Sequence, residues 1–176
     1  MTLGVVLAGG QSTRFGSDKA LAELHGQSLL SRAVEQMRCW CEEVVVVGRD
    51  SAPAPTLPDW PKAGMGPLGG LAAALNHAQQ QGHVAVLSMG VDVAGLPDDL
   101  PAQLAPAPAY LESQPVIGLW PASAAATLRG ILTSDGKHSM RQLAEAIDAR
   151  PVKIARKPAN INTPADLVAA EQTHGI

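Results

Sequence analysis

The sequence predicts a single-domain, three-layer α/β protein with a mainly parallel sheet over residues 1–176. Three short apolar runs, at residues 3–7, 44–47 and 84–87, are separated by segments with helical periodicity. Continuous valine- and leucine-rich strands that alternate with helices are typical of parallel sheets covered on both faces. A chain of 176 residues has the size of one domain with a substantial core.

The first half of the chain alternates regularly. After the strand at 3–7, apolar residues recur at helical spacing between Ser28 and Trp40, which predicts an amphipathic helix. Four prolines between residues 53 and 61 predict an irregular stretch after the second strand. An alanine-rich helix at 71–80 then leads into the third strand. Ligands bind such sheets at the carboxyl ends of strands, so the loops after Leu7, Val47 and Leu87 should converge.

The second half is less regular. A short helix is expected within 96–104, where Pro101 interrupts the pattern. Thr163 and Pro164 suit the N-cap and first position of a final helix. The remaining expected elements are a strand at 116–120, helices at 122–132 and 139–149, and a strand at 152–155.

Composition restricts the functional class. The net charge of −3 argues against binding to a nucleic-acid backbone. No apolar run approaches the ~18 residues of a membrane span, and the first residues show no secretory signal, so a cytoplasmic protein is expected. Cys39 and Cys41 are too close for a disulfide and are expected to be free thiols. The five histidines show no metal-ligand spacing and are expected to be structural or solvated.

Residues 5–19 form the most distinctive segment. An apolar strand runs into Gly9 and Gly10, and a polar loop follows whose cations, Arg14 and Lys19, are five positions apart. Glycines let backbone N–H groups approach phosphate oxygens, and two cations offset their charge. The spacing matches neither a P-loop nor a dinucleotide fingerprint. The structural alternative is a surface turn with two solvated cations.

The pattern L-A-G-G-x-x-x-R-x-G-x-x-K at 7–19 resembles the N-terminal signature of nucleotidyltransferases that activate sugars, sugar phosphates or cofactors. Within that superfamily the chain resembles the molybdenum cofactor guanylyltransferases. The similarity continues in family order through G-P-L-G-G at 66–70, Asp92 after an apolar strand, Gln114-Pro115-Val116, and N-I-N-T-P at 160–164. The resemblance implies a Rossmann-like sheet of the nucleotide-diphospho-sugar transferase type.

The resemblance also implies an activity: Mg²⁺-dependent transfer of GMP from GTP to molybdopterin cofactor, giving a guanine dinucleotide and pyrophosphate. The implied catalytic residues are Arg14, Lys19 and Asp92. Asp92 would hold the metal, and Lys19 would lie near the α-phosphate. The implied nucleotide-binding residues are Leu7, Ala8, Gly9, Gly10, Arg14, Lys19, Asp59, Gly66 and Asp92.

Two positions depart from the family pattern. Residues 91–94 read V-D-V-A where members have Cys-Asp-x-Pro, so a stiff turn after Asp92 is lost. Asp92 could instead be a turn or N-cap residue, with Asp98 and Asp99 as nearby acidic alternatives. Gly48 stands where the family often has asparagine, so the choice of guanine depends on the overall resemblance and on Asp59, whose carboxylate could accept from the base.

The acceptor side is expected near the C-terminus. Asn160 and Asn162 alternate along an extended segment and offer donors and acceptors to a pterin or phosphate, although Asn before Thr-Pro also makes turns. Gln114 and Pro115 could add to the same wall. Transient contact with molybdoenzyme maturation proteins is expected. The alternatives are a molybdopterin cytidylyltransferase, transfer to a sugar phosphate, or a nucleotide-binding regulator without turnover.

Overall fold

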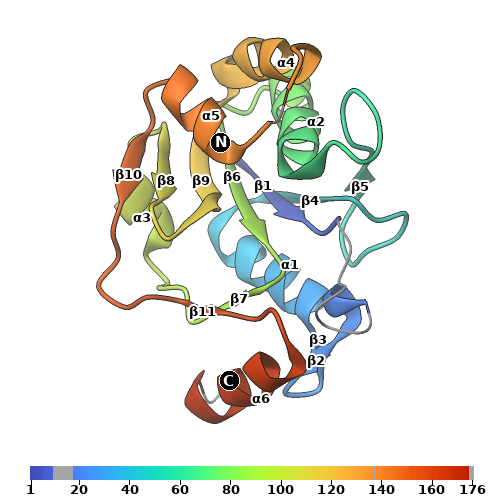
Figure 1. Ribbon diagram of the computed structural model, residues 1–176, viewed down its shortest axis with the longest axis vertical. Helices are drawn as coiled ribbons and strands as arrows, with labels where there is room; N and C mark the ends of the chain where they lie inside the picture. Colours follow the sequence, from blue (N-terminus) through green and yellow to red (C-terminus); the bar gives the residue numbers. More distant parts are fainter. Residues whose placement is uncertain (10–17, 137, 175–176) are drawn as a thin grey trace.

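A computed structural model describes residues 1–9, 18–136 and 138–174. Its centre is a seven-stranded sheet with the strand order β10-β8-β9-β6-β1-β4-β5 (Figure 1). The strands are β1 Thr2–Leu7, β4 Glu43–Val47, β5 Thr56–Leu57, β6 Ala85–Gly90, β8 Ala109–Leu111, β9 Gln114–Pro121 and β10 Arg150–Val152. β1 pairs in parallel with β4 and β6, and of the sheet's described strands β9 alone runs against the others. The predicted mainly parallel sheet is confirmed.

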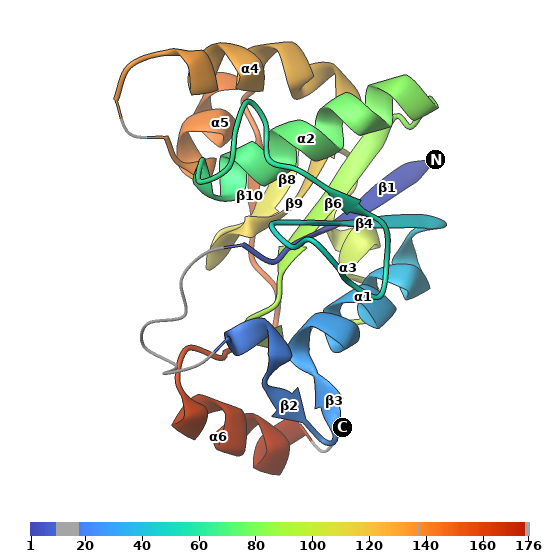
Figure 2. The same cartoon turned by 90° about the vertical axis from the view of Figure 1, so that its right-hand side faces the viewer.

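Helices cover both faces of this sheet and complete three layers (Figure 2). α1 Leu29–Trp40 and α3 Leu100–Leu104 pack on one face, and α2 Gly66–Gln81, α4 Ala125–Thr133 and α5 Met140–Ala146 pack on the other. Side chains along β1 alternate between the two faces of the sheet, and a hydrophobic core lies on each face. Leu3 and Val5 belong to the core on the α2 side, whereas Val6 belongs to the core on the α1 side.

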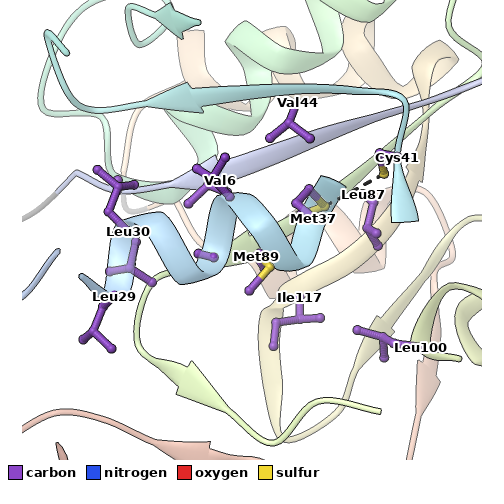
Figure 3. Packing of buried hydrophobic residues seen from close by; sticks show 14 of the residues in the cluster. Val6, Leu29, Leu30, Met37, Cys41, Val44, Leu87, Met89, Leu100 and Ile117 are labelled. Carbon is purple, nitrogen blue, oxygen red and sulfur yellow. Dashed lines mark hydrogen bonds between the residues drawn. The ribbon is translucent and has the colours of Figure 1, made fainter. Parts of the chain in front are cut away.

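The helix expected between Ser28 and Trp40 is confirmed as α1. Ser28 is its N-cap and accepts from Ser31 N at 3.1 Å. The five apolar residues at helical spacing are all buried and pack against the sheet (Figure 3); they are Leu29, Leu30, Ala33, Val34 and Met37. Cys39 and Cys41, at the end of this helix, are both free thiols.

Several element boundaries differ from the expected ones. The proline-rich stretch contains β5, because Val46 N donates to Pro55 O and draws the chain onto the sheet edge. α2 begins at Gly66, five residues before the expected start, since Pro67 fits the first turn of a helix. Pro101 likewise lies in the first turn of α3 and does not break it. The strand β8 was not expected.

Smaller differences concern element ends. The helix expected at 122–132 begins as the 3₁₀ turn η2 Ala122–Ala124, and the one at 139–149 ends at Ala146. The strand expected at 152–155 ends at Val152, where β10 stops pairing with β8.

A group of small elements lies beyond the carboxyl end of β1, at one end of the molecule in Figures 1 and 2. It contains η1 Lys19–Leu21, the hairpin of β2 Glu23–Leu24 and β3 Gln27–Ser28, β7 Val93–Ala94, β11 Ala159–Asn160 and α6 Pro164–His174. α6 packs on β2, and His25 N donates to Glu171 Oε1 at 3.4 Å. Among the described residues, no helix is long and apolar enough to cross a bilayer.

Candidate active site

The carboxyl ends of β1, β4 and β6 open into one cavity of about 830 Å³. Leu7, Val47 and Gly90, the last residues of these strands, all line it. The predicted convergence of the three loops is therefore confirmed, with the third strand extending to Gly90 rather than ending at Leu87. A cavity at this edge of a parallel sheet is the usual place for a ligand.

The floor of the cavity is built by close contact between the loops after β1 and β4. Ala8 N donates to Val47 O at 2.9 Å. Gly48 has φ +94°, and a Cβ atom there would lie 2.5 Å from the Cα of Gly9. Only glycine meets both demands, since it tolerates positive φ and leaves space for the neighbouring backbone. The packing of these two loops therefore requires glycine at position 48.

The first turn of α2 forms another wall. Gly66, Pro67 and Gly70 line the cavity, and a Cβ on Gly70 would lie 2.6 Å from Leu7 Cδ2. Small residues thus bring the helix end close to the strand ends. The N-cap residue Met65 makes no side-chain capping bond, so the amides of this turn have no side-chain cap. Their partial positive charge favours an anionic ligand.

Lys19 and Asp92 lie next to each other in the wall of the cavity. Lys19 Nζ lies 3.6 Å from Asp92 Oδ2, and the two side chains are 19% and 31% exposed. Lys19 begins η1, whose N-cap is Asp18: Asp18 Oδ1 accepts from Ala20 N at 3.2 Å. Two of the three predicted catalytic residues are thus brought together, although 73 positions separate them in the chain. The third, Arg14, lies outside the described residues, as does Gly10.

Asp92 is held by the C-terminal part of the chain. Ile161 N donates to Asp92 O at 2.7 Å, and β7 pairs antiparallel with β11 just beyond. Because ladder bonds alternate along an antiparallel pair, the next bonded pair is Ala94 with Ala159. A proline at position 94 could not donate there. Ala94 therefore suits this strand pairing in a way that a proline would not.

Asp98 and Asp99, the acidic alternatives, do not line the cavity. Asp99 precedes α3, and its Oδ1 accepts from Gln103 Nε2 at 2.8 Å. The carbonyl of Asp98 accepts from Trp40 Nε1 at 2.8 Å. The first bond is local to the start of α3, and the second links the end of α1 to the segment before α3.

Asp59 lines the cavity from the loop between β5 and α2, together with Gly64. Burial raises the pKa of the Asp59 carboxyl, against a smaller opposing effect of a hydrogen bond from the Gly64 backbone. Trp60 N donates to Gly69 O at 3.1 Å and fastens this loop to α2. Three carboxyl groups thus line the cavity: Asp92 near Lys19, Asp50 in the loop after β4, and Asp59 between β5 and α2.

Asn160 and Asn162 lie next to the Asp92 turn but do not line the cavity. Asn160 is an exposed residue of β11, opposite Val93. The backbone of Asn162 donates to Asp166 Oδ2 at 3.0 Å. Gln114 begins β9, two residues before Val116, which does line the cavity.

The segment after Asn160 forms a capping box for α6. Asp166 N donates to Thr163 Oγ1 at 3.1 Å, and Thr163 N donates back to Asp166 Oδ2 at 3.0 Å. These bonds, with the Asn162 amide, lower the pKa of the Asp166 carboxyl. The predicted N-cap at Thr163 is confirmed.

Sequence reasoning missed Arg49. This residue lines the cavity directly after β4, and its Nη1 lies 2.6 Å from Asp18 Oδ2. The available signal was its position: a cation immediately after a buried strand, at the sheet edge where the other site residues gather.

The described residues contain no group of three or more His, Cys, Asp or Glu side chains that could hold a metal ion. Asp92 still fits a Mg²⁺ site of the kind that uses one or two carboxylates, water and substrate phosphates. Its carboxylate faces the cavity and is partly exposed. A metal there would depend on a bound phosphate for its other ligands.

The sequence matches the model of the MobA-like NTP transferase domain over residues 4–154. A molybdenum cofactor guanylyltransferase from Acidiphilium cryptum (strain JF-5) is 38% identical, over 95% of this chain and 92% of its own length. One from Rhodobacter capsulatus is 34% identical, over 96% and 94%.

Solved structures show the same fold. Molybdopterin-guanine dinucleotide biosynthesis protein A from Archaeoglobus fulgidus has a TM-score of 0.74, 21% identity and 99% coverage of both chains. A putative glucose-1-phosphate thymidylyltransferase from Bacillus anthracis has a TM-score of 0.72 at 10% identity, covering 98% of this chain and 94% of its own. With the family model spanning most of the chain and relatives above 30% identity along nearly all of it, this protein belongs to the MobA-like NTP transferase family.

Proposed function

We propose that this protein transfers GMP from GTP to molybdopterin cofactor, forming a guanine dinucleotide and releasing pyrophosphate. The main structural support is the approach of Lys19 to Asp92 at 3.6 Å inside the cavity at the strand ends. The choice of substrates follows from the relatives, which are named molybdenum cofactor guanylyltransferases. The similarity to them extends along almost their whole length.

GTP would lie along the cavity between Asp92 and Asp59. Its triphosphate would contact the backbone of Leu7, Ala8 and Gly9 and the first turn of α2 at Gly66, where N–H groups and the helix dipole favour anions. The base would lie toward Asp59, whose ionised carboxylate can accept from the N1 and N2 donors of guanine. Gly10 and Arg14 are proposed to complete the phosphate loop.

The chemistry is an in-line substitution at the α-phosphorus. An oxygen of the acceptor phosphate forms the new P–O bond, and the bond to the β-phosphate breaks, so that pyrophosphate leaves with the electron pair. The acceptor phosphate is already ionised at neutral pH, so no side chain has to remove a proton. Lys19 would offset the charge that develops on the α-phosphate oxygens.

Membership of a nucleotidyltransferase family implies a divalent metal, and Mg²⁺ is the ion proposed here. Asp92 would hold it, and when bound it neutralises charge on the phosphate oxygens. The backbone of Asp92 is fixed by Ile161 N at 2.7 Å, which keeps the carboxylate at the cavity. This support for Asp92 counts against a regulator without turnover, because a metal-binding carboxylate is kept at the cavity although the usual proline is missing.

Molybdopterin would approach from the side of β7 and β11. Asn160 is exposed there, on the strand that pairs with the segment after Asp92. Asn160 and Asn162 are proposed to contact the pterin or its phosphate, with Gln114 at the start of β9. Proteins that mature molybdoenzymes would exchange the cofactor at this open side.

The proposed function is tested by pyrophosphate release with Mg²⁺ and fresh molybdopterin, comparing GTP, CTP, ATP and UTP. Turnover with GTP alone is expected. Turnover with CTP instead would overturn the base assignment but keep the reaction. Tight binding of Mg·GTP without pyrophosphate release would contradict the enzymatic proposal.

A further inference from the structure

The ion pair between Arg49 and Asp18 joins two segments of the cavity wall that lie 31 positions apart in the chain. Arg49 belongs to the loop after β4, whereas Asp18 immediately precedes Lys19. Their separation of 2.6 Å is that of a charge-assisted hydrogen bond. The Arg49 side chain is only 20% exposed, so most of its length lies against the protein.

Asp18 uses its two carboxylate oxygens for different purposes. Oδ2 accepts from Arg49, and Oδ1 accepts from Ala20 N at 3.2 Å, which caps η1. The orientation of one carboxylate therefore sets both the ion pair and the start of the turn that contains Lys19. Removing the guanidinium leaves Asp18 free to rotate away from the cap.

The loop that contains Arg49 is itself well anchored. Ala8 N donates to Val47 O at 2.9 Å, and Gly48 packs against the backbone of Gly9. Arg49 thus extends from a fixed part of the sheet edge toward Asp18. This fixed base is what a positioning residue requires, because a mobile partner could not orient the turn.

From this chain of contacts we infer that Arg49 is a positioning residue for the reaction: through Asp18 it orients η1 and thereby places Lys19 next to Asp92. The expected effect on kcat rests on the proposed function, whereas the orientation of η1 by Arg49 does not. A displacement of about 1 Å in a catalytic group costs up to about 10²-fold in rate. We expect Arg49→Gln to lower kcat about 10- to 100-fold, with the KM for GTP changed less than about threefold.

The structural arm of the test needs no substrate. Hydrogen exchange of the Ala20 and Leu21 amides is compared in the ligand-free wild type and in Arg49→Gln. Exchange at Ala20 should accelerate at least about fivefold, because its acceptor is no longer held. The matched control is Arg129→Gln, which removes another 2.6 Å arginine bond, to Asn76 Oδ1 between α4 and α2. The control should leave exchange in η1 and turnover unchanged.

A double-mutant cycle with Asp18→Asn distinguishes positioning from direct binding of phosphate by Arg49. If Arg49 acts through Asp18, the double variant should be about as slow as Asp18→Asn alone. Arg49→Lys, which keeps the charge, should restore part of kcat. If the losses of kcat in the two single variants multiply in the double variant, or if the KM for GTP changes more than kcat, Arg49 binds the nucleotide directly. Either result would overturn the inference.

The two proposals fail in different ways. Unchanged exchange at Ala20 in Arg49→Gln overturns the positioning role, whatever the wild type catalyses. Absence of pyrophosphate release by the wild type contradicts the proposed function, while accelerated exchange at Ala20 would still support the link from Arg49 through Asp18 to η1.

Discussion

Single residues at the strand ends determine the shape of this site. Gly48 is required by packing: its φ of +94° and its approach to Gly9 leave no room for a side chain. Lys19 shows the opposite case, a residue whose chemistry is evident from its motif and whose partner, Asp92, comes from a distant strand.

The packing of Gly48 can be measured directly. Gly48→Ala should cost about 1–3 kcal/mol of unfolding free energy, from backbone strain and from contact with Gly9. Gly82→Ala is the control: Gly82 also has positive φ, at +79°, but a Cβ there meets nothing within 4 Å. Urea denaturation should show the larger loss for Gly48→Ala. Equal losses would mean that contact with Gly9 contributes nothing.

Lys19 should matter for turnover far more than for folding. Lys19→Ala is expected to lower kcat at least about 10²-fold, since the developing charge loses its cation. The change in unfolding free energy should stay within about 1 kcal/mol, because the ion pair is partly exposed. Lys153→Ala is a matched control, as Lys153 Nζ also lies 3.6 Å from a carboxylate, that of Glu112. Turnover near the wild-type rate in Lys19→Ala would remove it from the mechanism.

At the scale of elements, side-chain hydrogen bonds join α2 to β4 and begin α6. At the amino end of β4, the carboxylate of Glu43 contacts His77 Nε2 of α2 at 2.8 Å and His83 Nε2 at 2.7 Å. This accounts for two of the five histidines as structural. The capping box of Thr163 and Asp166 begins α6.

The Glu43 cluster predicts an acid-dependent loss of stability. Hydrogen bonds from His77 and His83 lower the pKa of Glu43 from 4.5. A lowered folded-state pKa means that the stabilisation is present above pH 4.5 and is lost as the pH falls through the folded value. Between pH 5 and pH 3, urea denaturation should show a steeper decline for the wild type than for Glu43→Gln. Parallel declines would contradict this linkage.

The capping box predicts a local effect on α6. Thr163→Ala should cost about 1 kcal/mol, because the Asp166 amide loses its acceptor. Thr163→Ser keeps the hydroxyl and should cost less. Hydrogen exchange of the first turn of α6 is the measurement, and equal exchange in the two variants would refute the capping role.

At the scale of the whole molecule, the fold brings residues of the candidate site from β1, β4, β6 and the C-terminal segment to one edge of the sheet. Ligand binding at their shared edge should therefore stabilise the entire fold by linkage. Mg·GTP at 100 times its Kd is expected to add about 2.7 kcal/mol.

Thermal unfolding tests this expectation. The midpoint should rise with Mg·GTP, and EDTA should reverse most of the rise. In Asp92→Asn the dependence on Mg²⁺ should be lost, because the amide no longer offers a charged ligand. If EDTA leaves the shift intact in the wild type, the metal assignment to Asp92 is wrong.

Much of this protein was determined by local sequence. The buried strands, the helix from Ser28 to Trp40 and the cap at Thr163 depend on periodicity and on neighbouring residues, and all three predictions are confirmed. The phosphate-loop motif likewise identified Lys19 from adjacent residues, and its proposed role stays a prediction.

Other features depend on contacts between distant residues, which no local pattern encodes. β5 exists because Pro55 O accepts from Val46 N at the sheet edge. The pairing of Arg49 with Asp18, and of Ile161 with Asp92, follows from strand order and not from spacing. Local sequence determined the elements and their chemistry, whereas the tertiary structure decided which side chains meet, because hydrogen bonds and ion pairs act over a few ångströms regardless of separation along the chain.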